Sequence, residues 1–282
     1  MEPAVPGSDL IAGTLVGLVA AALGAPTPAV DGTDVRLRED LEALSRRAVI
    51  FGHQSVGMNI LDGLAQLSSR GGVPLRIVDV SAGPAAPPGT LAHLFVPENG
   101  KPITKLSSFA RALDSFPPGG ADIALIKFCY VDFEPSTDPV ALFSRYEETV
   151  ARLQAASPEK RFVHVTAPLS TVQGGPKAWV KRLLGRTPHG LAENARREEY
   201  NALLRKAYAG RAPVFDLARV ESTLPDGTRS TTTWNGRTFP VLAAPYTDDD
   251  GHLNQVGRIL AAREFLAVLA SVPLDPPAPR AR

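Results

Sequence analysis

The chain has one cysteine, Cys129, and almost no excess of charge of either sign. A single thiol can form neither an internal disulfide nor a zinc site built from several cysteines. The cysteine count therefore does not distinguish an oxidising from a reducing compartment. The 30 Lys and Arg residues nearly balance the 29 Asp and Glu residues, which leaves a formal net charge of +1. So weak an overall field gathers neither nucleic acid nor anionic lipid, and it favours a small, neutral or weakly charged substrate.

Long hydrophobic runs are also scarce, and the one that stands out covers residues 10–25. Its length suits the apolar core of a signal peptide, and the small residues near Ala25 suit a cleavage site. Residues 1–9 contain no Lys or Arg, which a signal normally has there. A loosely packed Ala-rich tail is the alternative, and so short a run is marginal for spanning a bilayer. We expect an extracytoplasmic or secreted protein without a stable membrane span, or a cytoplasmic one if residues 1–30 are not a signal.

What the chain has in quantity is an alternation of short apolar runs with amphipathic stretches. Strand-like runs cover residues 48–51, 75–80, 123–128, 162–166 and 213–217. Helical patterns cover residues 56–69, 103–116, 139–156, 191–208 and 254–271. Strands separated by helices pair in parallel, and right-handed crossovers place the helices on both faces of the sheet. The pattern predicts one α/β domain over residues 31–275, a three-layer α/β/α sandwich of about five parallel strands, followed by a Pro-rich tail at 276–282.

Two long segments interrupt this alternation. Residues 81–102 are rich in Pro and Gly, and residues 168–190 contain Gly174, Gly175 and Trp179. Long connections without their own structure are often functional loops, and both leave from the carboxyl end of an expected strand. Because ligands bind at that edge in open parallel sheets, we expect both segments to border the functional site.

Ser55 lies in the run FGHQSVGMN, between the first expected strand and the first expected helix. A serine at this junction exposes its hydroxyl at the carboxyl edge of the sheet, and its N–H lies at the positive end of a helix. Gly52 and Gly57 would permit a close turn and close approach of a substrate. The alternative is that Ser55 only caps the helix, as serine often does.

A base for such a serine is available in the run YTDDDGHLNQVG, where Asp249 precedes His252 by three residues. At this spacing the carboxylate can orient one imidazole nitrogen while the other faces the serine. Gly251 would give the turn its freedom, and Asn254 would cap the last helix. Three consecutive acids beside a histidine could instead bind a metal, but too few ligands converge for this, and we expect no metal.

These two runs resemble the first and last sequence blocks of the SGNH (GDSL-like) hydrolase superfamily, and the likeness covers roughly residues 45–272. The last block is the specific part, matched by Asp249, His252, Asn254 and Gly257. The first block departs from the commoner Gly-Asp-Ser, since it reads His53-Gln54-Ser55. The resemblance implies a flavodoxin-like fold and a serine esterase with a Ser55–His252–Asp249 triad and no cofactor. It also implies small esters, lipids or acetylated carbohydrates as substrates, and an O-acyltransferase would use the same residues.

The middle blocks depart further from the family, which supplies a glycine and an asparagine as extra oxyanion donors. Where Gly-x-Asn is expected, the chain reads Lys127-Phe128-Cys129-Tyr130, with Cys129 at the asparagine position. Asn99-Gly100 is the best candidate for the glycine block. Two alternatives stay open: a cysteine nucleophile, Cys129, served by His252, and a non-catalytic carbohydrate-binding or scaffold protein on a degenerate hydrolase fold.

Other histidines carry weaker signals. His164 lies inside an expected strand and is predicted to be structural, with a hydrogen-bond partner. His53, next to the serine run, either contacts substrate or serves as a polar residue of the turn. His93 and His189 are expected in loops and show no informative spacing. The sequence does not indicate an oligomeric state.

Overall fold

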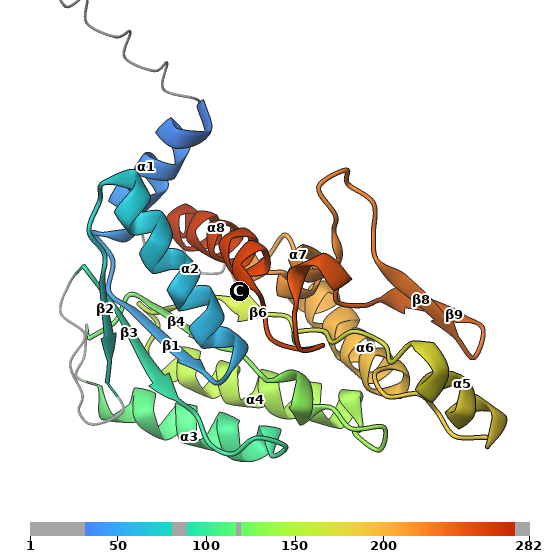
Figure 1. The fold of residues 1–282 in the computed structure, drawn as a ribbon. Helices are drawn as coiled ribbons and strands as arrows, with labels where there is room; N and C mark the ends of the chain where they lie inside the picture. The colour runs from blue at the N-terminus through green and yellow to red at the C-terminus, as the bar shows by residue number, and fades with distance from the viewer. Residues whose placement is uncertain (1–31, 81–88, 117–119, 274–282) are drawn as a thin grey trace, which may run out of the picture. The chain divides into compact units, whose positions relative to one another are not determined.

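Five parallel strands form the central sheet of the computed structural model, in the order β2-β3-β1-β4-β5 (Figure 1). Their bounds are β1 Val49–His53, β2 Arg76–Asp79, β3 Thr90–Phe95, β4 Ile123–Ile126 and β5 Arg161–Phe162. Helices cover both faces of this sheet, so the predicted three-layer α/β/α sandwich is confirmed. The parallel register places the carboxyl ends of β1, β3 and β4 side by side, which is where the site residues lie.

The structure describes residues 32–80, 89–116 and 120–273, which belong to one compact unit. The signal-like segment at 1–30 and the Pro-rich tail at 276–282 lie outside the described residues, so export remains a prediction. Within the described ranges, no helix combines the length and apolar character needed to cross a membrane.

One layer of helices comprises α1, α2, α7 and α8, and the other comprises α3, α4 and α6 (Figure 1). The bounds of the first layer are α1 Gly32–Leu44, α2 Val56–Gly71, α7 Leu217–Ser222 and α8 Gln255–Ser271. Those of the second are α3 Pro102–Ser115, α4 Pro139–Ala156 and α6 Leu191–Tyr208. In the first layer, α8 packs against α2, where Gly63 lets the two helix backbones approach closely.

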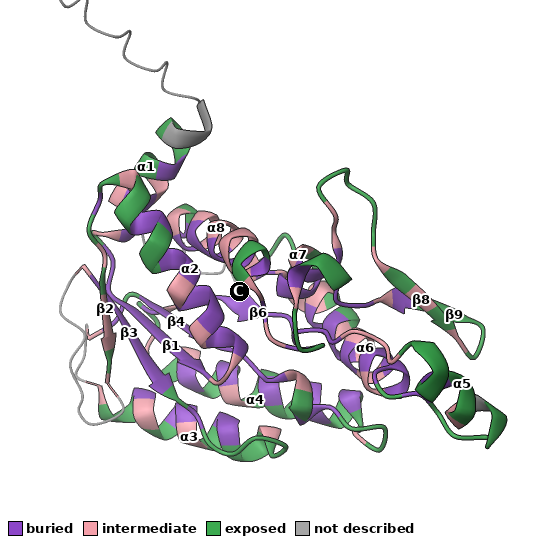
Figure 2. Cartoon of the chain, viewed as in Figure 1, coloured by how far each residue is buried: buried purple, intermediate pink, exposed green. Residues whose placement is uncertain are grey.

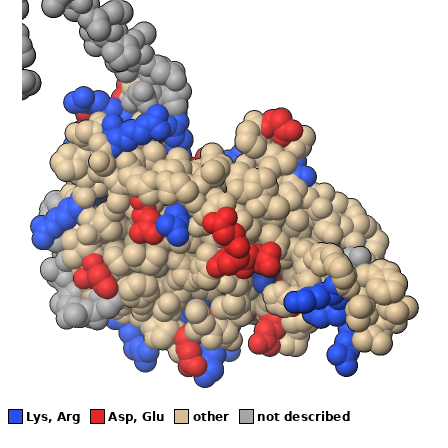
Figure 3. All heavy atoms as spheres, in the orientation of Figure 1, with Lys and Arg blue, Asp and Glu red and all other residues tan. Residues whose placement is uncertain are grey.

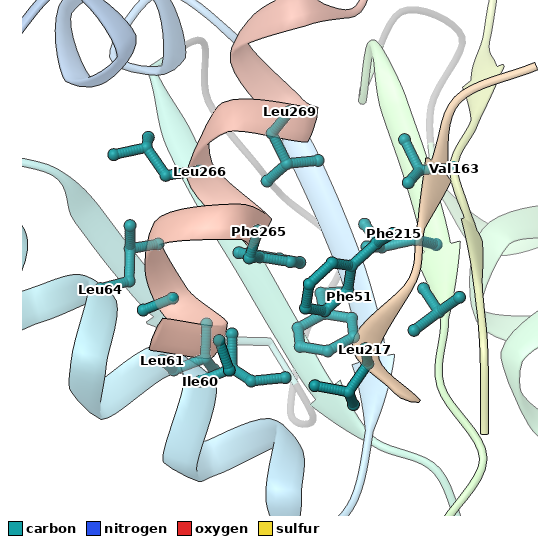
Figure 4. Packing of buried hydrophobic residues seen from close by; sticks show 14 of the residues in the cluster. Phe51, Ile60, Leu61, Leu64, Val163, Phe215, Leu217, Phe265, Leu266 and Leu269 are labelled. Atoms are coloured by element: carbon teal, nitrogen blue, oxygen red, sulfur yellow. The ribbon is translucent and has the colours of Figure 1, made fainter. Parts of the chain in front are cut away.

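The core sits on both sides of the sheet because successive residues of a strand face opposite layers. In β1, Val49 and Phe51 join the cluster under α2 and α8, whereas Ile50 joins the cluster under α3 and α4. Figure 2 shows β1 buried along its length. Figure 4 shows Phe51 between side chains of α2, α8 and the strand that carries Phe215, and the Phe51 and Phe265 ring centroids lie 5.3 Å apart.

The strand expected over residues 162–166 is present as two short pieces. β5 belongs to the main sheet, and β6 (His164–Val165) pairs in parallel with β7 (Val214–Phe215). Val163 between them donates its N–H to the carbonyl of Ala124, so the chain still runs alongside β4 between the two pieces. The predicted structural role of His164 is confirmed: its Nδ1 lies 2.8 Å from the Tyr146 hydroxyl, and burial lowers its pKa to about 3.

Several elements lie where the sequence pattern predicted loops or gave no signal. β3 and α5 (Gly175–Leu183) fall inside the two expected long loops, and α1 precedes the first expected strand. The antiparallel hairpin of β8 (Thr231–Trp234) and β9 (Arg237–Pro240) follows α7. Two 3₁₀ turns, Tyr130–Asp132 and Ala244–Tyr246, complete the described elements.

Candidate active site

Ser55 occupies a sharp junction between β1 and α2. Its φ of 52° lies in the left-handed region, a conformation that costs a non-glycine residue about 1–3 kcal/mol and persists where the surroundings enforce it. The side chain forms no capping hydrogen bond with α2. Its Oγ is instead hydrogen-bonded to Nε2 of His252. The capping alternative is therefore wrong, and the hydroxyl is directed at the imidazole.

The other imidazole nitrogen of His252 is held by Asp249. Nδ1 lies 2.6 Å from Oδ2 of Asp249, while Oδ1 accepts the backbone N–H groups of His252 at 2.7 Å and Gly251 at 3.2 Å. Partial burial raises the pKa of Asp249, but these hydrogen bonds outweigh burial and hold it at about 2. Asp249 is therefore ionised across the neutral range and fixes a tautomer with the proton on Nδ1, which leaves Nε2 to accept the Ser55 proton.

The loop that carries His252 is anchored to both neighbouring helices. Oδ1 of Asn59, one turn after Ser55 on α2, accepts the N–H of Leu253 at 3.0 Å. Asn254 accepts the N–H groups of Val256 and Gly257 at 3.1 and 3.2 Å, so its predicted capping of the last helix is confirmed. The sequence pattern gave no reason to single out Asn59, although it lies inside the first block.

Tyr130 forms a wall of the site that the sequence pattern did not reveal. Its ring meets the His252 ring edge-on, with centroids 5.7 Å apart. A Cβ at position 251 would come within 2.6 Å of this ring. Position 251 therefore requires glycine because Tyr130 packs closely against it, and not because the turn needs a left-handed residue there. The left-handed residue of the turn is Asp250, with φ of 72°.

The roles expected for the glycines near Ser55 also differ from those found. A Cβ at Gly52 would meet the Phe109 ring at 2.5 Å, and one at Gly57 would meet the His53 ring at 2.4 Å. Both glycines therefore permit internal packing, not approach of a substrate. His53 itself is buried, with Nε2 3.2 Å from Nδ1 of His93, and burial lowers its pKa to about 3. It is a neutral core residue rather than a substrate contact.

Asp132 binds the backbone at Gly100 and Cys129, the two positions where the family resemblance implies extra oxyanion donors. It accepts the N–H of Gly100 at 2.8 Å and that of Cys129 at 2.6 Å, and it forms a fully buried ion pair with Lys105 at 2.7 Å. Neither N–H is free to hold an oxyanion in this arrangement. Lys105 also donates to Oδ1 of Asn99 at 2.8 Å, and the exposed amide NH₂ of Asn99 has no acceptor among the residues that the structure describes.

The cysteine alternative finds little support in the geometry. The Cys129 side chain is fully buried, and its sulfur contacts Nζ of Lys127 at 3.9 Å. Both nitrogens of His252 are already engaged, by Ser55 and Asp249. His252 therefore has no nitrogen left to activate the thiol.

The three consecutive acids point in different directions. Asp249 binds His252, Asp250 accepts the Thr171 hydroxyl at 2.6 Å, and Asp248 accepts the Asn254 amide at 3.3 Å. In the described part of the chain, no group of three or more His, Cys, Asp or Glu side chains converges as metal ligands would.

A pocket of about 360 Å³ adjoins the Asp249 side of the site. Its lining comprises Tyr130, Ser170, Thr171, Gln173, His189, Asp249, Asp250 and Gly251. His189 lies in a loop, as expected, and its exposed ring faces Glu193 at 3.7 Å. A larger cavity of about 680 Å³ lies among α1, α7 and α8. None of the site residues lines it, so we assign it no role in the reaction despite its size.

No family model and no curated protein matches the chain, but solved structures do. A GDSL-like lipase from Bacteroides thetaiotaomicron is 12% identical, with a TM-score of 0.47 over 84% of this chain and 96% of that chain. The periplasmic domain of a lipopolysaccharide acetyltransferase from Salmonella ser. Paratyphi A is 12% identical, with a TM-score of 0.43 over 83% and 95%. The OSK domain of Drosophila Oskar is 12% identical, with a TM-score of 0.39 over 78% and 86%.

The chain is thus similar in structure, at low identity, to a GDSL-like lipase, the group whose sequence blocks it resembles.

Proposed function

We propose that the protein is a serine ester hydrolase with Ser55 as nucleophile, His252 as general base and Asp249 as the group that orients His252. The hydrogen-bonded chain from the Ser55 hydroxyl through both nitrogens of His252 to the Asp249 carboxylate carries this proposal. The side chains of His252 and Asp249 are 41% and 56% exposed, so an ester can reach them at the carboxyl edge of the sheet.

In the proposed reaction, Ser55 Oγ attacks the ester carbonyl while Nε2 of His252 removes its proton. The resulting imidazolium is stabilised by the ionised Asp249 and returns the proton to the leaving alcohol, which leaves an acyl-serine. Water, deprotonated by His252 in turn, then releases the acid. If an alcohol takes the place of water in this second step, the same residues perform acyl transfer.

The oxyanion requires donors that the rest of the fold does not use. In the described residues, the N–H of Ser55 donates to no protein acceptor and lies at the positive end of α2. The NH₂ of Asn99 is the second donor in this proposal, because Lys105 binds the carbonyl oxygen of this exposed side chain and leaves its amide nitrogen available. Two such donors supply the transition-state stabilisation that acyl transfer needs.

Labelling of the full chain with a fluorophosphonate, which reacts with activated serines, tests the proposal. We expect modification at Ser55, located by peptide mapping, and loss of that modification in Ser55→Ala. His252→Ala should slow labelling by at least about 100-fold, since general-base assistance contributes on that order. Ser115→Ala, which removes an exposed serine at the far end of α3, is the control and should label normally.

Two results would argue against the proposal. Labelling that persists in Ser55→Ala but disappears in Cys129→Ser would indicate the cysteine enzyme. A folded chain that does not label and hydrolyses no acetyl ester would indicate the non-catalytic binding protein.

A further inference from the structure

Helix α5 carries large apolar side chains that the protein does not bury. Trp179 is 63% exposed and Leu183 71% exposed, and Val180 and Leu184 are exposed as well. These are four of the ten exposed large hydrophobic side chains in the described part of the chain, gathered on one short helix and the residue after it. Among the described side chains of α5, only Ala178 is buried. Figures 1 and 2 show α5 at one end of the molecule, exposed along most of its length.

The same segment is strongly basic although the whole chain is nearly neutral. Residues 174–190 contain four basic residues and no Asp or Glu. The basic residues are Lys177, Lys181, Arg182 and Arg186. Figure 3 shows Lys and Arg side chains gathered at the end of the molecule where α5 lies. Although the net charge of the whole chain is near zero, the α5 segment therefore has a local positive field around its exposed apolar face.

We propose that this surface, formed by Lys177, Trp179, Val180, Lys181, Leu183, Leu184 and Arg186, docks on an anionic lipid membrane. Helices that lie in the membrane interface combine Trp and Leu on one face with Lys and Arg beside it. Trp179 and Leu183 are four residues apart, as are Lys177 and Lys181, so each pair follows one side of the helix. The indole of Trp179 suits the headgroup level, and the basic side chains meet the negative lipid surface.

A second copy of the chain fits this surface less well. The other six exposed large hydrophobic side chains in the described part of the chain are distributed one to an element, so no other element presents an apolar face like that of α5. They are Val35, Phe95, Ile103, Val131, Val140 and Val256. Pairing α5 with itself would bring its basic side chains together, which like-charge repulsion disfavours.

The position of α5 ties docking to the proposed site. The segment departs and returns at Gln173 and His189, where the N–H of Gln173 donates to the carbonyl of His189 at 2.9 Å. Both residues line the pocket beside Asp249. Docking would bring that pocket to the lipid surface, where an ester borne by a lipid or by a membrane-attached molecule is available. The docking itself does not depend on the proposed function.

Fluorescence of Trp179 tests the docking directly. Trp234→Phe in the full chain leaves Trp179 as the single tryptophan, since the sequence has two. We expect its emission to shift to the blue with vesicles of phosphatidylglycerol and phosphatidylcholine. We also expect quenching by lipids brominated in their acyl chains. Lys177→Gln with Lys181→Gln should weaken vesicle binding by about 30-fold at low salt, whereas Arg145→Gln with Arg152→Gln on α4 should not.

Three outcomes would overturn the proposal. Vesicle binding without a change at Trp179 would show that another segment makes the contact. A blue shift that depends on protein concentration and needs no lipid would show self-association. Equal binding to vesicles of phosphatidylcholine alone, unaffected by the lysine substitutions, would contradict an anionic surface. Ser55→Ala should bind vesicles normally, which separates this test from that of the proposed function.

Discussion

Asn59 connects the segment that carries Ser55 with the segment that carries His252. Its Oδ1 accepts the N–H of Leu253, and its side chain is buried, so water cannot replace that bond. Ser55 sits in a left-handed conformation one turn earlier on the chain. A strained nucleophile and a base from a distant loop need such a link, because a displacement of about 1 Å in reacting groups can cost on the order of 100-fold in rate.

Asn59→Ala is therefore expected to slow fluorophosphonate labelling of Ser55 and to destabilise the protein by about 1–3 kcal/mol, since the buried N–H of Leu253 loses its acceptor. Asn59→Asp keeps an oxygen at that position and should retain more of the labelling rate. Labelling rates and urea unfolding of both variants provide the measurement. Gln66→Ala is the control, because Gln66 also joins α2 to the last helix, through Gln255, but at an exposed site. Equal effects of Asn59→Ala and Gln66→Ala would contradict the positioning role.

At the scale of elements, Asp132 joins the loop after β3 to the loop after β4. Its carboxylate accepts from Gly100, Cys129 and Lys105, and both charged side chains of the pair are fully buried. Removing one member of a buried ion pair leaves an unpaired charge away from water. We call this group of Asp132, Lys105 and the two backbone N–H groups the Asp132 clamp. It also orients Asn99, because Nζ of Lys105 donates to both Asp132 and Asn99.

Lys105→Met should lower the free energy of unfolding by about 3–5 kcal/mol. Replacing both partners, Lys105→Met with Asp132→Leu, should cost less than the sum of the single changes, because no buried charge is left over. Urea unfolding of the single and double variants gives the coupling. The exposed pair Arg145–Glu148 on α4 is the control, and its removal should change stability by at most about 1 kcal/mol. If Lys105→Met behaves like Arg145→Met, the clamp is unimportant.

The sequence predicts elements best where periodicity is strong and the partners are local. β1, α2, α4, α6 and α8 lie close to their expected ranges because each repeats apolar residues at its own period. β3 is missed because its short run TLAHLF lies inside a Pro- and Gly-rich segment, and it becomes a strand only through pairing with β1 and β2.

The candidate site shows the same contrast between what local sequence signals predict and what only the fold brings together. Ser55, His252 and Asp249 follow from residue type and spacing. Tyr130 and Asn59 do not, because their roles come from contacts between segments far apart in the chain. Gly100 was expected near the oxyanion, and this expectation is wrong for the same reason. Its N–H is bound by Asp132, which lies in a different loop.

At the scale of the whole molecule, one buried acid connects stability to pH. The side chain of Glu221 on α7 is buried, and its Oε2 accepts the N–H of Leu169 at 2.6 Å, while its Oε1 has no hydrogen-bond partner in the described ranges of the chain. Burial raises its pKa to about 8, although the Leu169 N–H and the charges of Lys127 and Arg197 oppose the shift. The folded protein therefore holds a proton here that the unfolded chain releases near its ordinary pKa of 4.5.

Because the folded state binds this proton more tightly, its contribution to stability is complete below about pH 4.5 and declines as pH rises toward 8. The slope from one proton is at most about 1.4 kcal/mol per pH unit. Glu221→Gln cannot ionise, yet it keeps an acceptor for Leu169, so the variant should lose this part of the decline. Urea unfolding from pH 5 to 8 measures it, with the exposed Glu148→Gln as control. Parallel pH profiles of the Glu221→Gln and wild-type chains would contradict the assignment.

The proposed nucleophile and its base are 197 residues apart in the chain. A ribosome that adds about 5–20 residues per second needs about 10–40 s between them. Throughout that interval the emerging chain contains Ser55 but neither His252 nor α8, whose Phe265 and Leu269 complete the core around α2. A nascent chain that has not yet reached His252 and α8 should therefore be inactive, and the proposed esterase becomes competent only after both have been synthesised.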